Sequence, residues 1–142
     1  KKMKHVEVAL SICVLDEKVK NKLEPNSSSI EERLETLKEL KQNGIKSVVF
    51  VSPIIPQITD YITIIERTKA FTDEYWFDNL SLRSSFKTKM FKFIDEEYPI
   101  YKSLYDDIYN RKNLQYFEEI DSNIKDYCEK NNIVYKTFYA GT

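Results

Sequence analysis

The chain has 142 residues, of which 42% are hydrophobic, so it is long enough to bury one core of ordinary domain size. Its 22 basic and 23 acidic residues leave a formal net charge of -1, which excludes a global electrostatic attraction to nucleic acid or to an anionic membrane. The two glycines are too few for a turn-rich all-β fold, and no apolar run approaches the ~18 residues of a membrane-spanning helix. We therefore expect a cytoplasmic protein with no membrane partner.

The first half of the chain alternates between strand-like and helix-like hydrophobic periods. Residues 6–14 form an apolar run with a single charge, as expected of a strand that is covered on both faces. A helix follows, capped by Ser28 with Glu31 or by Ser29 with Glu32, and Gly44 ends it. Two further strands are predicted at 46–52, ended by Pro53, and at 74–82, with a helix capped by Thr59 or Asp60 between them. This order is typical of βαβ crossovers and a parallel sheet.

The composition shifts after Arg83. A helix is predicted at 86–97, Pro99 interrupts it, and the helical pattern resumes at 100–109. A last helix at about 117–128 and a strand at 133–139 complete the chain. The sequence therefore predicts an α/β protein with parallel strands, followed by a helical extension and a terminal strand.

Polar side chains cluster where the predicted strands end, and in a parallel sheet these ends lie on the same side. After the three strands come Ser11, Cys13 and Asp16, then Ser52 to Ile55, then Asn79, Ser81 and Arg83. Alternation from Tyr75 and Phe77 puts Asn79, Ser81 and Arg83 on one face, which we expect to face inward toward a ligand. The alternative is that these residues are solvated strand ends without a ligand.

Four separated segments resemble the later half of radical S-adenosylmethionine (SAM) enzymes, in the group of spore photoproduct lyases and proteins described as DNA repair photolyases. In the barrel of these enzymes, the end of the fourth strand is similar to residues 11–17, and the loop and helix start after it are similar to residues 24–34. The exit of the fifth strand is similar to residues 52–56, and the sixth strand to residues 77–83. The resemblance implies a partial (βα) barrel, with residues 1–84 as its rear half and 85–142 as an extension of one incomplete domain. Gln57 stands where the family commonly has glycine, so either Gln57 is strained at a positive φ or the turn differs from that of the family.

The resemblance also implies that these strand ends bind SAM. By position, Ser11 would offer a hydroxyl to the ribose or the methionine part, and Ile54 or Ile55 would pack against the adenine. Asn79 and Arg83 would make polar contacts with cofactor or substrate. Arg33 would pair either with the cofactor's carboxylate or in a salt bridge on a helix surface.

The family holds a 4Fe–4S cluster with three cysteines spaced C-x3-C-x2-C, whereas this chain has only Cys13 and Cys128. We expect the SAM and 4Fe–4S cofactors in an intact parent enzyme, with no cofactor bound to this chain alone and both cysteines buried and inert. The expected partner is the missing amino-terminal half of the barrel, because a strand begins within about five residues of the first residue. Binding of nucleic acid rests on the family analogy alone.

Other interpretations stay open at this stage. The chain is alternatively a stand-alone α/β binding or interaction module without catalysis, and an open sheet edge predicts self-association. The tyrosines at 98, 101, 105 and 109 form either a base-stacking platform or the packing face of a helix. The basic cluster of Arg83, Lys87, Lys89 and Lys92 contacts phosphates or belongs to a solvated mixed-charge face. His5 is read as a surface residue.

Overall fold

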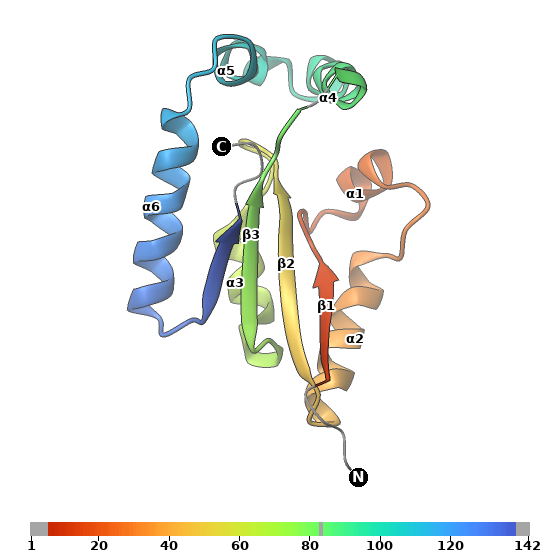
Figure 1. Ribbon diagram of the computed structural model, residues 1–142. Helices are drawn as coiled ribbons and strands as arrows, with labels where there is room; N and C mark the ends of the chain where they lie inside the picture. The colour runs from red at the N-terminus through yellow and green to blue at the C-terminus, as the bar shows by residue number, and fades with distance from the viewer. Residues whose placement is uncertain (1–5, 83, 139–142) are drawn as a thin grey trace.

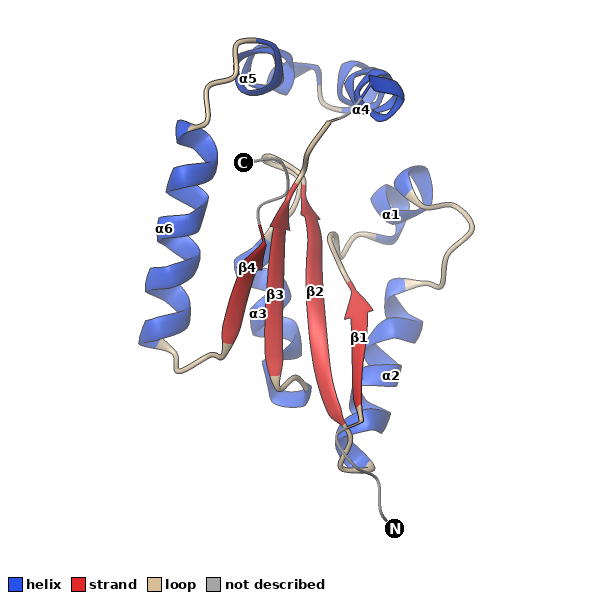
Figure 2. Cartoon of the chain, in the orientation of Figure 1, coloured by secondary structure: helices blue, strands red, loops and turns tan. Residues whose placement is uncertain are grey.

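The computed structural model describes residues 6–82 and 84–138, which form an α/β fold around one parallel sheet (Figures 1 and 2). Within this part, each strand pairs in parallel with the next one along the chain. The strands are β1 (Glu7–Ser11), β2 (Lys46–Ile54), β3 (Glu74–Asn79) and β4 (Tyr135–Phe138). The predicted α/β class with parallel strands and a terminal strand is confirmed.

Six α-helices connect and extend the sheet within the described residues. They are α1 (Glu17–Leu23), α2 (Ile30–Gln42), α3 (Tyr61–Thr68), α4 (Ser84–Glu97), α5 (Lys102–Tyr105) and α6 (Gln115–Lys130). Short turns of 3-10 helix lie at Lys69–Phe71 and Pro99–Tyr101, and a π-helical turn lies at Asp106–Asn110. None of the described helices is both long enough and apolar enough to span a membrane.

The helix caps follow the sequence closely. Ser29 and Glu32 form the capping box of α2, with Ser29 Oγ accepting a hydrogen bond from the Glu32 amide at 3.0 Å. Asp60 rather than Thr59 caps α3. Gly44 has a φ of 68° after the end of α2, a conformation that favours glycine. Local side-chain chemistry therefore sets where these helices begin and end.

Strand β2 runs past Pro53 to Ile54, although Pro53 was predicted to end it. The pairing with β3 shifts register between Val51 and Ile54, and such a bulge accommodates a residue without a backbone N–H. Strand β1 is shorter than predicted and ends at Ser11, and β3 ends at Asn79.

All three long helices that flank the sheet pack on the same face. Val49, Val51, Tyr75 and Phe77 of β2 and β3 form one buried core with residues of α2, α3 and α6, namely Leu37, Ile64, Ile65, Ile120, Ile124 and Cys128. Figure 1 shows α2 and α3 behind the sheet. The other face carries no helix among the described elements, and Ala9 and Ser11 of β1 are exposed there. The prediction that β1 is covered on both faces is therefore wrong.

We call this uncovered side the open face, and we define it by Ala9, Ser11, Phe50, Trp76 and Phe138. The three aromatic rings pack edge to face, with centroids of Phe50 and Trp76 5.9 Å apart and those of Trp76 and Phe138 5.8 Å apart. Phe138 is still 43% exposed. No described helix covers this aromatic patch on the open face.

A second core lies beyond the carboxyl ends of the strands. Cys13, Val14, Ile55 and Leu80, which follow the three strand ends, pack with Met90 and Ile94 of α4 and with Tyr105 of α5. Figure 1 shows α4 and α5 beyond these ends of the sheet. The helical extension therefore shares a core with the strand ends.

A row of alternating charges crosses the open face near the amino ends of the strands. Lys46 Nζ lies 3.5 Å from Glu7 Oε1 and 3.2 Å from Glu74 Oε1, and Lys136 Nζ lies 3.7 Å from Glu74 Oε2. Each of the four strands contributes one charge, in the order negative, positive, negative, positive.

Replacing Glu74 with glutamine is expected to lower the free energy of unfolding at neutral pH by about 1 kcal/mol and to flatten its acid dependence. The Trp76 indole N–H donates to Glu74 Oε2 at 2.9 Å, and with Lys46 and Lys136 it holds the pKa of this carboxyl below its ordinary value. A lowered pKa contributes stability above the unfolded pKa of about 4.3, and that stability is lost as the pH falls through the folded pKa. Urea denaturation between neutral and acid pH measures both effects.

Glu39→Gln on the exposed side of α2 is the matched control and should change neither the stability nor its pH dependence. If the free energy of unfolding falls as steeply with acid in Glu74→Gln as in the unaltered chain, Glu74 is not the source of the acid dependence.

Candidate functional site

The candidate site lies at the carboxyl ends of β1 and β2, where two family-like segments meet. The Ser11 hydroxyl donates a hydrogen bond to the Ser52 carbonyl oxygen at 3.2 Å, although the two residues are 41 positions apart. Ser11 is exposed on the open face. Its hydroxyl therefore has remaining hydrogen-bonding capacity toward a ligand on that side.

Arg33 ties the loop between α1 and α2 to the end of β1. Its side chain is 8% exposed, and Nη1 donates to the Ser11 carbonyl oxygen at 2.8 Å. The remaining donors reach the loop, with Nη2 bonding Glu24 Oε1 at 3.0 Å and Ser27 Oγ at 2.9 Å, and Nε bonding Ser28 Oγ at 3.2 Å. Arg33 thus makes a salt bridge from a buried position in a part-buried network, rather than on a helix surface.

Lys20 is a second buried cation beneath the same loop. It is 2% exposed, and its Nζ donates to the Ser27 carbonyl oxygen at 2.7 Å and to Asn21 Oδ1 at 3.2 Å. Sequence reasoning missed Lys20, because its position among other lysines in α1 gives no sign of burial. It also gave no role to Glu24. Together Lys20 and Arg33 hold residues 24–29 in one conformation.

The turn after β2 is held just as firmly. Thr59 Oγ1 accepts a hydrogen bond from the Ile55 amide at 2.8 Å, and the Tyr105 hydroxyl donates to the Pro56 carbonyl oxygen at 2.7 Å. Gln57 has a φ of 65°, so of the two alternatives, a residue strained at positive φ or a different turn, the structure contains the positive φ. Its amide and its Nε2 both donate to the Tyr116 hydroxyl, at 3.0 and 3.1 Å.

Replacing Gln57 with glycine is expected to leave the free energy of unfolding within about 0.5 kcal/mol of its present value. Relief of the left-handed backbone, about 1 kcal/mol, offsets the greater entropy of the unfolded glycine chain and the lost side-chain hydrogen bond. Gln57→Val should instead destabilise by about 1–2 kcal/mol, because a β-branched residue is strained at positive φ. Urea denaturation of both variants is the measurement, and equal stabilities for them would contradict the backbone argument.

The five predicted site residues divide between the two sides of the sheet. Ser11 lies on the open face, whereas Ile54 is 1% exposed in the helix-side core and Ile55 is 2% exposed in the second core. Asn79 is in register with Ile54. Arg83 lies outside the described residues. The strand ends do converge at one end of the sheet, but the described members of the set lie on different sides of it.

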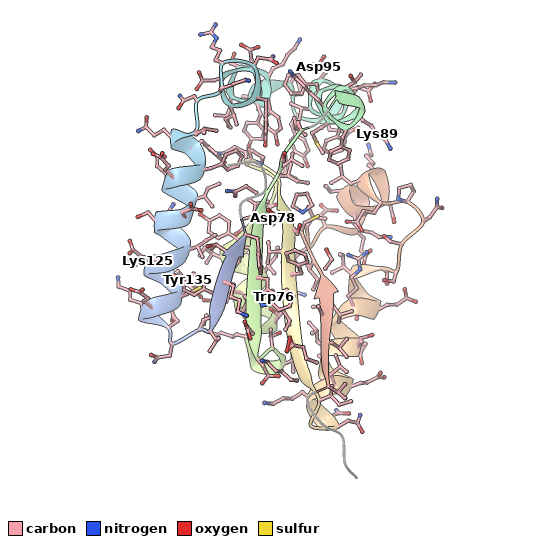
Figure 3. The ribbon with its side chains drawn as sticks, in the orientation of Figure 1. Trp76, Asp78, Lys89, Asp95, Lys125 and Tyr135 are labelled. Carbon is pink, nitrogen blue, oxygen red and sulfur yellow. The ribbon has the colours of Figure 1, made fainter. Side chains whose placement is uncertain are left out.

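The sequence predicted that Asn79, on the same face of β3 as Tyr75 and Phe77, points inward toward a ligand. This prediction is wrong, because that face is the one the helices cover. Those two aromatic residues are at most 1% exposed and pack against the helices, so alternation places Asn79 on the helix side. Trp76 lies on the open side instead, as the labelled residues of β3 show in Figure 3. The Oδ1 atom of Asn79 is buried and has no hydrogen-bond partner in the described part of the chain.

A small cavity of about 120 Å³ lies between the α1–α2 loop and α4. Its lining is mostly apolar, and it includes Pro53, Ile55 and Met90 together with Glu24 and Lys89. Figure 3 labels Lys89 on α4. This volume accommodates a fragment of a cofactor or substrate rather than a whole nucleoside.

Neither cysteine has the character of a metal ligand or nucleophile. Burial, and next the nearby Glu24 carboxylate, raise the pKa of Cys13 to about 12, and its thiol lies 3.7 Å from Glu24 Oε2. Burial raises the pKa of Cys128 to about 11. Both side chains are buried, as predicted. Over the described ranges no group of three His, Cys, Asp or Glu residues could hold a metal ion.

The tyrosine stripe is a packing face. Tyr105 is 1% exposed in the second core, and the Tyr109 hydroxyl donates to the Leu80 carbonyl oxygen at 2.9 Å. Tyr98 and Tyr101 stack with centroids 5.9 Å apart. The packing interpretation is therefore confirmed. In the basic cluster, Lys87 lies over the Phe91 ring, 5.7 Å from its centroid, while His5 lies outside the described residues.

Comparison with known proteins gives one similarity of substantial length. The chain is 38% identical over 126 residues to the uncharacterized protein MJ0683 of Methanocaldococcus jannaschii. The match covers 88% of this chain and 47% of the relative, so the chain spans about half the length of the curated relative it matches. No family model matches the sequence, and no solved structure matches it.

Proposed function

We propose that this chain is the rear half of a radical SAM barrel of the spore photoproduct lyase-like group, and that it supplies part of the SAM pocket and of the substrate wall. The observation that carries the proposal is the meeting of three family-like segments at one end of the sheet. Arg33 of the second segment donates to the Ser11 carbonyl oxygen, and Ser11 of the first donates to the Ser52 carbonyl oxygen of the third. Segments of a shared site must converge in this way.

The arrangement of helices and strands also supports the proposal. In a (βα) barrel the helices surround the strands, and the inner face of the sheet is covered by the rest of the barrel. Here α2, α3 and α6 pack on one face only, and the open face carries Phe50, Trp76 and Phe138. The helices therefore lie where the outer layer of a barrel would be.

The residues present fit SAM in part. Ser11 offers an exposed hydroxyl on the open face, and Ile55 and Pro53 line the small cavity between the α1–α2 loop and α4. The side chain of Ile54 packs in the helix-side core, so it is not a wall of that cavity. Arg33 acts as a positioning residue, because its donors are taken up by Ser11, Glu24, Ser27 and Ser28.

The residues do not fit a 4Fe–4S cluster, which in this family takes three cysteine thiolates. The chain has two cysteines, Cys13 and Cys128, and burial raises the pKa of both thiols well above neutrality. In the intact enzyme a reduced cluster together with SAM would supply the radical chemistry. The contribution of this chain is to bind, orient and exclude water.

Anaerobic reconstitution of the chain with iron and sulfide is expected to yield no stable cluster. Two buried thiols in separate cores cannot replace three clustered thiolates. The measurement is the visible charge-transfer absorbance after desalting, with iron and sulfide analysis. Stoichiometric 4Fe–4S incorporation would contradict the expectation.

Binding of SAM to the chain tests the proposal directly. In a ¹⁵N-labelled sample titrated with SAM, we expect amide shift changes around Ser11, Ser52 and Ile55, and none along α6. Ser11→Ala should weaken the effect several-fold through the loss of one hydrogen bond. Ser122→Ala, an exposed serine on α6, is the matched control.

Changes scattered over the surface, or none at all at saturating SAM, would overturn the proposal. That outcome would favour a stand-alone binding or interaction module, because a fold by itself does not imply one function.

A further inference from the structure

Both edges of the sheet are without a neighbouring strand in the described part of the chain. Strand β1 pairs only with β2, and β4 pairs only with β3. Unpaired N–H and C=O groups along such edges are a template for pairing with another strand. Because all four strands are parallel, a second parallel sheet can extend either edge without reversing direction.

The two edges carry opposite charges on the same face. The charge row begins with Glu7 at the β1 edge and ends with Lys136 at the β4 edge. The Lys136 side chain is 61% exposed, and the Glu7 side chain is 36% exposed, so both can reach a further partner. If β4 of one copy lies beside β1 of another, Lys136 meets Glu7 and the alternation of charges continues.

Side-chain sizes on the open face are also complementary. Strand β1 presents the small residues Ala9 and Ser11, whereas β2, β3 and β4 present Phe50, Trp76 and Phe138. Small residues beside the β4 edge of a neighbour leave room for Phe138, as alternating small and large side chains do inside small barrels. Like edges brought together would instead place equal charges side by side.

We propose that a second copy of this chain covers the open face, with β4 of each copy paired in parallel to β1 of the other around a twofold axis along the strands. Two sheets of four strands then close into eight, a number at which side chains fill a parallel barrel. The twofold axis makes two identical edge contacts, so the assembly closes as a dimer. This inference concerns the chain by itself, stands on its sheet edges and does not rest on the proposed function; in the intact enzyme proposed above, the other half of the barrel would take the place of the second copy.

Sedimentation velocity over a concentration series tests the assembly. We expect a monomer–dimer equilibrium, with shielding of Trp76, the single tryptophan, from acrylamide as the dimer forms. Lys136→Glu and Glu7→Lys should each weaken dimerisation about tenfold, because each creates two like-charge contacts. The matched controls are Lys125→Glu and Glu129→Lys on α6, which is part of the helix layer; Lys125 is labelled in Figure 3.

Mixing the two weakened variants is the decisive step. In a mixed dimer the Lys136→Glu edge meets the Glu7→Lys edge, and the other contact keeps the original pair, so dimerisation should recover. Circular dichroism of each variant verifies that it is folded. A monomer at every concentration, a dimer that neither variant weakens, or a mixture that shows no recovery would overturn the proposal. The behaviour of the unaltered chain decides the matter if a variant does not fold.

Discussion

Replacing Arg33 with alanine is expected to lower the free energy of unfolding by about 2 kcal/mol, less than the loss for a fully buried ion pair, because Glu24 is 34% exposed. The change leaves the Glu24 carboxylate without its partner and the Ser11 carbonyl oxygen without its 2.8 Å hydrogen bond. The loop of residues 24–29 also loses the contacts to Ser27 and Ser28. Urea denaturation gives the stability, and amide hydrogen exchange should show faster opening of this loop.

Arg33→Lys separates charge from geometry. A lysine keeps the charge but not the planar fork that reaches several acceptors, so about half of the loss should remain. Arg67→Ala is the matched control, because Arg67 is exposed on α3, and it should stay within about 0.5 kcal/mol. A loss below about 1 kcal/mol for Arg33→Ala would show that the network does not hold the loop.

Replacing Tyr105 with alanine is expected to cost about 3–5 kcal/mol and to loosen the carboxyl ends of the strands. Tyr105 is 1% exposed, packs edge to face on Phe91, and donates to the Pro56 carbonyl oxygen at 2.7 Å. It therefore joins the helical extension to the turn that follows β2. Urea denaturation followed by circular dichroism and by Trp76 fluorescence gives the stability of both parts.

Tyr105→Phe removes the hydroxyl alone and should cost about 1 kcal/mol. Ile100→Ala, at a residue that is 82% exposed, should have almost no effect. Because the second core joins the extension to the strand ends, both probes should report one transition at the same urea concentration. Two separate transitions would show that the extension folds independently of the sheet.

Local patterns were sufficient for much of the architecture. The change of hydrophobic period located the strands and most helices, although it missed α1. The serine and glutamate spacing offered two capping boxes, of which the structure contains that of Ser29 and Glu32. The likeness of the Gln57 turn to a glycine-containing one offered a positive φ as one of two alternatives, and the structure contains it. These features depend on residues that are near one another in sequence, so a single sequence reveals them.

The side of the sheet that the helices cover could not be predicted in this way. Alternation along β3 separates Tyr75 and Phe77 from Trp76, but aromatic residues stand on both faces, so the pattern does not say which set is buried. The structure places Tyr75 and Phe77 beneath α2, α3 and α6. Because side chains alternate along each strand, Asn79 therefore lies on the helix side and Ser11 on the open face.

The composition and periodicity of the sequence by themselves predicted the parallel α/β class and the buried cysteines, whereas the structure decided that the tyrosine stripe is a packing face. Only the tertiary structure decided that Arg33 and Lys20 are buried. Lys20 donates to a carbonyl oxygen of the folded α1–α2 loop, and Arg33 donates to the end of a strand 22 residues away. A buried cation is stable only where such acceptors converge. That convergence is a property of the folded chain, since residues distant in sequence supply the acceptors.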